Sequence, residues 1–181
     1  MTANYDKGWF RMEMAARFEQ VSEHQFLNDW TKAMGGDGQA AKAVYASLRI
    51  PERATAGSAG YDFFAPVDFT LLPGCSVRLP TGIRVKIREG WLLAIFPRSG
   101  LGFKYRLQLD NTVGIVDSDY YGADNEGHIQ IQMTNCNPDK PLSVKAGEGF
   151  AQGIFLPFGL AEGDAADGMR HGGFGSTTPR E

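Results

Sequence analysis

The chain has 181 residues, 43% of them hydrophobic, which is enough for one domain with its own core. Its formal net charge of -3 argues against a broad surface for polymeric nucleic acid, although a small phosphorylated ligand needs only local positive charge. Charges interrupt the N-terminal apolar residues, and the longest apolar run, near residues 150–160, is too short to span a bilayer. We therefore expect a cytoplasmic protein without membrane contact.

Residues 1–47 differ from the rest and predict an extension, a strand and a short helix packed on the core. The strand is expected within residues 11–21. Residues 22–25 match a capping box, in which the Ser22 hydroxyl and the Gln25 side chain satisfy free amides at a helix start. Behind this box, apolar residues recur every four positions, at Phe26, Trp30 and Met34.

From residue 43 the pattern becomes that of many short strands separated by tight turns. Strand-like runs cover residues 44–50, 60–65, 76–78, 82–87, 91–96, 129–134, 142–144 and 154–158. This spacing is typical of a barrel or a jelly-roll sandwich, so we expect a β core over residues 48–160. Residues 161–181 are rich in Gly, Ala and Asp and predict a flexible C-terminal arm.

Residues 109–122 are the most informative segment and predict one β-hairpin with chemistry on it. Asn111 can offer a donor and an acceptor together, as a nucleobase edge requires. Gly114 permits close approach of the backbone. Asp117 can serve as a base, and the ring of Tyr120 can lie flat against a sugar.

Four further segments stand out, at residues 59–62, 97–102, 147–152 and 170–177. In the second of these, Arg98, Ser99 and Gly100 offer a guanidinium, a hydroxyl and unhindered amides to phosphate oxygens. In the last, Arg170 and Phe174 lie among glycines, which predicts a tail that orders over a bound nucleotide.

The five segments, in this order, resemble the five motifs of the trimeric dUTP diphosphatases (dUTPases) over residues 43–178. The resemblance implies an all-β, distorted jelly-roll-like barrel with a short N-terminal helix. It implies hydrolysis of dUTP to dUMP and pyrophosphate, which limits uracil in DNA and supplies dUMP for thymidylate synthesis. It also implies a homotrimer with shared active sites and a Mg²⁺ ion held mainly by the triphosphate and water.

Residue roles follow from the same resemblance. Asp117 is the expected catalytic residue, activating a water that attacks the α-phosphorus. Asp62 supports the site from behind, where it could orient magnesium-bound water, and no protein side chain is expected to bind metal directly. The expected substrate-binding residues are Arg98, Ser99, Gly100, Asn111, Gly114, Ile115, Val116, Tyr120, Gln130, Gln152, Arg170, Phe174, Gly175 and Ser176.

The chain also departs from the family pattern. An acidic insertion at residues 123–127 follows the third motif, and Gly149 replaces the usual Arg of the fourth. Two alternatives stay open: a dCTP deaminase of the same fold, although no glutamate follows Ser99, and a regulatory module that binds a protein partner under dUTP control. The three histidines have no metal-ligand spacing and are expected to be solvated.

Overall fold

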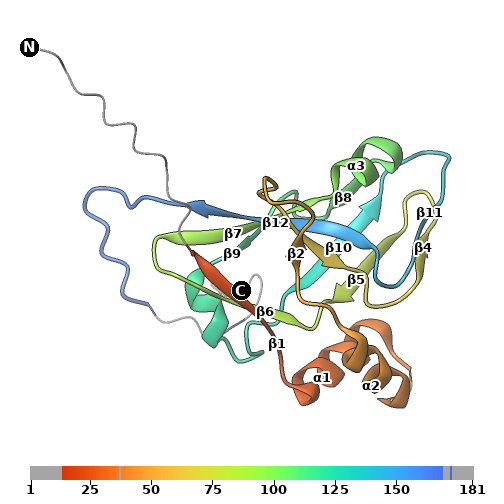
Figure 1. Ribbon diagram of the computed structural model, residues 1–181, viewed down its shortest axis with the longest axis horizontal. Helices are drawn as coiled ribbons and strands as arrows, with labels where there is room; N and C mark the ends of the chain where they lie inside the picture. Colours follow the sequence, from red (N-terminus) through yellow and green to blue (C-terminus); the bar gives the residue numbers. More distant parts are fainter. Residues whose placement is uncertain (1–13, 37, 169–171, 173–181) are drawn as a thin grey trace, which may run out of the picture.

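The computed structural model describes residues 14–36, 38–168 and 172, and its course is shown in Figure 1. The candidate residues Arg170, Phe174, Gly175 and Ser176 lie outside the described residues. No helix in the described part of the chain is long and apolar enough to cross a membrane.

The described strands pair antiparallel in four sheets. A five-stranded sheet has the order β2 (Glu52–Arg53), β3 (Tyr61–Phe64), β12 (Gly149–Pro157), β7 (Trp91–Pro97), β9 (Gly114–Val116), and a three-stranded sheet has the order β5 (Ser76–Pro80), β10 (Gln130–Asn135), β8 (Leu107–Leu109). Two strand pairs complete the set, β1 (Ala16–Gln20) with β6 (Ile83–Ile87), and β4 (Phe69–Leu71) with β11 (Leu142–Val144). The helices are α1 (Glu23–Met34), α2 (Gly38–Ser47), α3 (Ser99–Tyr105) and the 3₁₀ helix η1 (Ser118–Gly122).

One core lies between the sheets, because alternate strand residues point inward. In β6 the apolar residues Ile83, Val85 and Ile87 are buried, while the polar residues between them are not. The predicted all-β, jelly-roll-like architecture is confirmed, although the described sheets do not close into one barrel.

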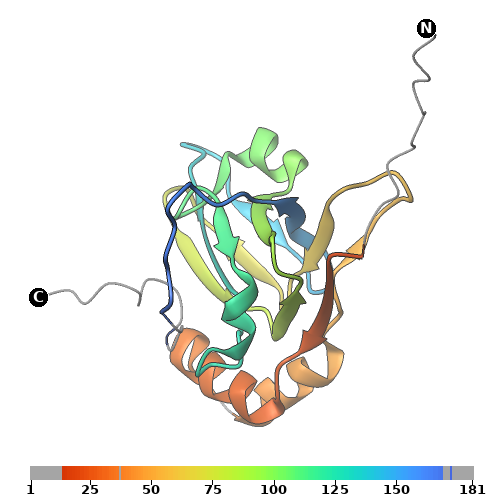
Figure 2. The ribbon, with the colours of Figure 1, turned by 90° about the vertical axis from the view of Figure 1, so that its left-hand side faces the viewer.

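A second apolar cluster joins the N-terminal helices to the rest, at the lower end of the molecule in Figures 1 and 2. The prediction of a strand over residues 44–50 is wrong, because residues 38–47 form α2. This segment is rich in alanine, the best helix former. Its Tyr45 packs against Phe26 and donates a 2.7 Å hydrogen bond to the Val21 carbonyl, so packing overrides the β preference of Val44 and Tyr45.

The helix start after Ser22 is confirmed in part. The Ser22 hydroxyl accepts a hydrogen bond from the Gln25 amide over 3.1 Å, as predicted. The reciprocal contact is different, because the Gln25 side chain donates to Asp29 and the Ser22 amide donates to Glu126.

The prediction of one β-hairpin over residues 109–122 is wrong in its pairing. β8 pairs with β10, whereas β9 pairs with β7 in the other sheet. The segment therefore crosses between two sheets, and the residues after β9 form η1 instead of a returning strand.

Candidate active site

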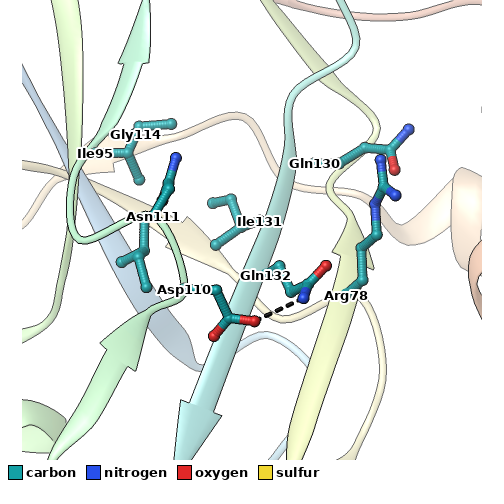
Figure 3. A pocket seen from close by; sticks show the side chains of 9 residues that line it. Arg78, Ile95, Asp110, Asn111, Gly114, Gln130, Ile131 and Gln132 are labelled. Carbon is teal, nitrogen blue, oxygen red and sulfur yellow. Dashed lines mark hydrogen bonds between the residues drawn. The ribbon is translucent and has the colours of Figure 1, made fainter. Parts of the chain in front are cut away.

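A cavity of about 380 Å³ lies at this crossing, between strands of different sheets. Figure 3 shows Asn111 and Gly114 on one side, Gln130 and Arg78 on the other, and Ile131 between them. The complete lining consists of Arg78, Ile95, Leu109, Asp110, Asn111, Gly114, Gln130, Ile131 and Gln132.

The lining combines an apolar floor with amide groups. Ile95, Leu109 and Ile131 belong to the buried core. Asn111 and Gln130 each carry hydrogen-bond donors and an acceptor. A flat heteroaromatic ring suits this combination, because its faces are apolar and its edge carries polar groups. The structure thus brings together three predicted substrate residues, Asn111, Gly114 and Gln130.

Strand β9 adds main-chain groups to this cavity. It is the edge strand of its sheet and pairs with β7 on one side only, and an edge strand presents alternate N–H and C=O groups outward. A Cβ atom on Gly114 would lie 3.3 Å from the Cβ atom of Ile95, so a side chain there would crowd the floor. Ile115 and Val116 continue the strand, with the first side chain 45% exposed and the second buried.

The backbone beside Asn111 is held in an unusual conformation. Thr112 has φ 65°, a left-handed value that costs a β-branched residue about 1–3 kcal/mol. The Thr112 amide donates to the Leu109 carbonyl over 2.9 Å, and the Val113 amide donates to the Asn111 carbonyl over 2.8 Å. These bonds fix the wall of the cavity that carries the Asn111 amide.

Asp117 stands directly after β9, at the N-cap of η1. Its carbonyl oxygen accepts a hydrogen bond from the Tyr120 amide over 3.2 Å, so the short helix fixes its backbone. The residue is half-buried and does not itself line the cavity. Three residues of extended strand, about 10 Å, separate it from Gly114.

The expectation that the Tyr120 ring lies against a sugar stays a prediction, and in this structure the ring packs in the core. The side chain is in the core and only 2% exposed. Its hydroxyl donates to the His128 carbonyl over 2.9 Å and accepts from the Asn125 amide over 2.8 Å. The insertion at residues 123–127 supplies Asn125, so the departure from the family pattern explains where this ring is anchored.

A second polar cluster lies at the far end of β7 and joins three of the other predicted segments. The Arg98 guanidinium contacts the Asp62 carboxylate over 3.2 Å. The Arg98 side chain is 43% exposed. The Gln152 amide donates to the Pro97 carbonyl over 3.1 Å. Two adjoining cavities of about 420 and 370 Å³ share Arg98 and Ser99 in their linings.

Glycines make room for this cluster. A Cβ atom on Gly149 would lie 2.8 Å from Nη1 of Arg98, and a Cβ atom on Gly60 would lie 2.7 Å from Oε1 of Gln152. The glycine that replaces the usual Arg of the fourth segment therefore accommodates Arg98, which also donates to the Gly149 carbonyl over 3.4 Å.

Ser99 and Gly100 begin helix α3. The first amides of a helix have no acceptor within the helix. Both residues are exposed and line the larger of the two adjoining cavities, so the hydroxyl of Ser99 and these amides face the same space as Arg98.

The two clusters are separated within one chain. Val116, next to Asp117, pairs with Leu93, whereas Ser99 stands six residues further along the chain. Extended strand rises about 3.4 Å per residue, so the part of β7 from Leu93 to Pro97 alone separates the two clusters by about 14 Å. The structure therefore does not bring Asp117 to Arg98, Ser99 or Gln152 in a single copy.

Sequence reasoning missed two candidate residues, Arg78 and Gln132, and wrongly expected His128 to be solvated. Arg78 and Gln132 project from the same face of neighbouring strands, where they are directly paired; the alternation of polar and apolar residues in both strands is the signal that could have identified them. His128 is fully buried, not solvated. Its Nε2 atom accepts from the Gly82 amide over 2.8 Å and its Nδ1 atom lies 2.7 Å from Asp29, so Nδ1 carries the proton.

Comparisons with known proteins identify the family of the chain. The dUTPase family model matches residues 46–178. The deoxyuridine 5'-triphosphate nucleotidohydrolase of Lactococcus lactis subsp. lactis (strain IL1403) is 42% identical over 135 residues, which cover 73% of this chain and 89% of that protein. The counterpart from Desulfitobacterium hafniense (strain DSM 10664 / DCB-2) is 40% identical over 137 residues, or 71% and 87% of the two chains.

Solved structures give the same result at the level of the fold. The crystal structure of dUTPase from Streptococcus mutans superposes with a TM-score of 0.59 at 32% identity, covering 81% of this chain and 98% of that one. The Staphylococcus bacteriophage 80alpha dUTPase with dUPNHPP superposes with a TM-score of 0.59 at 20% identity, covering 92% and 100% of the two chains.

Proposed function

The chain belongs to the dUTPase family and is a dUTP diphosphatase, and we propose that its two polar clusters meet on one dUTP molecule at a boundary between subunits. The observation that carries the proposal is the amide-lined cavity of Asn111 and Gln130, beside strand β9, which Asp117 directly follows. The cavity would bind the base, and Asp117 would act on the phosphate chain.

Base selection rests on the cavity. Asn111 and the outward main-chain groups of β9 would pair with the edge of uracil. Cytosine carries a donor where uracil carries an acceptor, so its amine would leave a polar group unpaired, at a cost of about 1–3 kcal/mol. The methyl group of thymine would press on the packed floor near Gly114.

Hydrolysis needs a base, an aligned water and stabilisation of the leaving group. Asp117 would accept a proton from a water molecule whose oxygen bonds to the α-phosphorus, while the bond to the bridging oxygen breaks and pyrophosphate leaves. Arg98, with Ser99, Gly100 and Gln152, would hold the phosphate oxygens.

The separation of the two clusters supports a shared site. About 14 Å of strand β7 lies between Leu93, the partner of Val116, and Pro97, which precedes Arg98. This is further than a triphosphate chain extends. One copy would thus supply the cavity with Asp117, and a second would supply the Arg98 cluster. In a closed homotrimer, every copy would supply its cavity to one site and its Arg98 cluster to another. The arm with Arg170, Phe174, Gly175 and Ser176 would close over the nucleotide.

The dUTPase family generally uses Mg²⁺, and the dUTPase of phage phi11 of S. aureus coordinates a structural Mg(II) ion. Within residues 14–36, 38–168 and 172, no three His, Cys, Asp or Glu side chains form a group that could hold a metal ion. Mg²⁺ keeps water and accepts phosphate oxygens as ligands, so the triphosphate would hold it and its charge would stabilise the leaving pyrophosphate. Asp62 is placed beside Arg98, where it would orient a metal-bound water.

Pyrophosphate release tests the proposal, measured side by side with dUTP, dCTP, dTTP and UTP. Release from dUTP alone is expected. Ammonia from dCTP would instead support the deaminase alternative. A protein partner that copurifies and is displaced by dUTP, with no release of pyrophosphate, would support a purely regulatory module.

A further inference from the structure

The acidic insertion at residues 123–127 forms a tight turn against η1. The Ala123 amide donates to the Tyr120 carbonyl over 3.1 Å, and the Glu126 amide donates to the Ala123 carbonyl over 2.8 Å. Glu126 has φ 58°, and Gly127 follows with φ 69°. A Cβ atom on Gly127 would lie 2.6 Å from the Tyr120 carbonyl oxygen, so the turn packs directly on the backbone of η1 and has no room for a side chain there.

Glu126 links this turn to the N-terminal extension. Its carboxylate accepts from the Ser22 amide over 2.8 Å and from the Ser22 hydroxyl over 2.6 Å, and it lies 3.8 Å from Arg84. Glu126 therefore completes the cap of helix α1 in place of Gln25. Burial opposes the charge on Glu126, but the Ser22 hydrogen bonds and Arg84 outweigh it and lower the pKa of this carboxyl.

A second link joins the extension to η1 itself. The Tyr121 hydroxyl donates to Glu19 of β1 over 2.8 Å, and the Arg84 guanidinium stacks on the Tyr121 ring at 3.7 Å. The bond from Tyr121 is the largest of the effects that hold the pKa of Glu19 below its usual value. The η1 helix is therefore clamped from β1 and from β6.

The third link passes through the core. His128, which follows the turn, joins Asp29 of α1 to the Gly82 amide of the core, and its carbonyl accepts the Tyr120 hydroxyl. Figure 2 shows the segment after β9 running toward the two N-terminal helices. The extension and η1 thus share three separate connections.

We propose that Glu126 is a positioning residue for the reaction: through the turn at residues 123–127 and η1, it fixes the backbone of Asp117 and makes turnover depend on the N-terminal extension. This inference rests on the proposed function, because it requires Asp117 to act as the base. The lining of the base cavity includes none of the residues of this network. Loss of Glu126 is therefore expected to change kcat and to leave KM largely unchanged.

Steady-state kinetics with dUTP test this, using the full chain with Glu126→Ala and Glu126→Gln. A misplacement of about 1 Å can cost about a hundredfold in rate, so we expect kcat of Glu126→Ala to fall about ten- to a hundredfold with KM within about twofold of the parent. Glu126→Gln retains one acceptor and should recover part of kcat. Tyr121→Phe, which removes one hydroxyl, should lower kcat in the same direction if Glu126→Ala does not fold.

Asp68 provides a matched control, because its carboxylate also accepts a backbone amide, from Ala146, and contacts a cation, Lys145. Asp68→Ala should lower Tm without changing kcat. The inference would be overturned if Glu126→Ala had the same kcat as the parent. It would also be overturned if Asp68→Ala, with a Tm equal to that of Glu126→Ala, lost as much kcat.

Asp117→Asn, measured in parallel, separates this failure from failure of the proposed function. If Asp117→Asn is inactive while Glu126→Ala and Tyr121→Phe turn over normally, only the positioning role is wrong. If Asp117→Asn retains full turnover, the proposed base is wrong and the positioning inference fails with it.

Discussion

The two polar clusters of this chain are built in opposite ways. The base cavity has a floor of core residues and a wall fixed by a strained Thr112 backbone. The Arg98 cluster is an open surface, where an Arg98 side chain that is 43% exposed meets one carboxylate and the start of a short helix. The shape of the base cavity is therefore fixed by the packing of one chain, whereas the charge of Arg98 lies at the surface.

This difference suits a division of work between subunits. Rejection of a wrong base depends on packed atoms that cannot adjust, so it belongs in a cavity with a rigid floor. Phosphate binding depends on charge and amide donors that tolerate small shifts, so it can be completed across a boundary. If so, the two clusters act separately in one chain and together in an assembly, and variants of each cluster can test this.

Asp117→Asn gives the largest expected loss. The amide preserves shape but cannot take a proton, so turnover should fall about 10²- to 10⁴-fold while dUTP binding is retained. Single-turnover kinetics and equilibrium binding measure the two quantities separately. Normal turnover in this variant would remove Asp117 as the base.

Mixing two inactive variants tests the shared site directly. Arg98→Ala and Asp117→Asn should each be inactive alone. If a site takes Arg98 from one subunit and Asp117 from another, about a quarter of the sites in a randomly mixed 1:1 assembly carry both intact groups. Unfolding and refolding the mixture should then restore about that fraction of activity. No recovery, with assembly confirmed by light scattering, would place both residues in one copy.

The motif pattern predicted which polar side chains lie near one another, because the residue types that suit one ligand recur in each segment. Asn111 and Gln130 meet at one cavity, and Arg98 meets Asp62 and Gln152, as the motif pattern implied. Strand periodicity also located β6 and most of β10, because alternate burial leaves a period of two in the residues themselves. Strand β7 was located by its continuous apolar run instead, and three successive residues of it are buried.

The parts that failed depend on contacts distant in sequence. Residues 109–122 alternate like a hairpin, but β8 and β9 find partners in different sheets. Tyr120 belongs to a motif segment, yet its hydroxyl is held in the core by Asn125 of the insertion and by the His128 carbonyl. The helix α2 replaces a predicted strand because Tyr45 packs against Phe26. None of these partners is encoded in the local pattern.

Asn111→Ala should weaken the base cavity without disturbing the Arg98 cluster. Loss of the amide removes hydrogen bonds to the base, so kcat/KM for dUTP should fall about ten- to a hundredfold, and the ratio of dUTP to dCTP turnover should fall with it. Gln108→Ala is the control, since Gln108 lies on the exposed face of β8 outside the cavity lining. An unchanged ratio for Asn111→Ala would show that the base is read elsewhere.

Tyr120→Phe gives the smallest expected effect on turnover. It tests whether the Tyr120 hydroxyl contributes to stability and not to discrimination between dUTP and UTP. The hydroxyl makes two buried hydrogen bonds, to His128 and from Asn125, so its loss should destabilise the protein by about 1–3 kcal/mol. Because the ring is only 2% exposed, discrimination between dUTP and UTP should stay the same. Denaturant unfolding and the ratio of the two turnover rates measure these outcomes. Lost discrimination with unchanged stability would mean that the ring leaves the core when substrate binds, and the contrast between a rigid base side and an open phosphate side would then no longer hold.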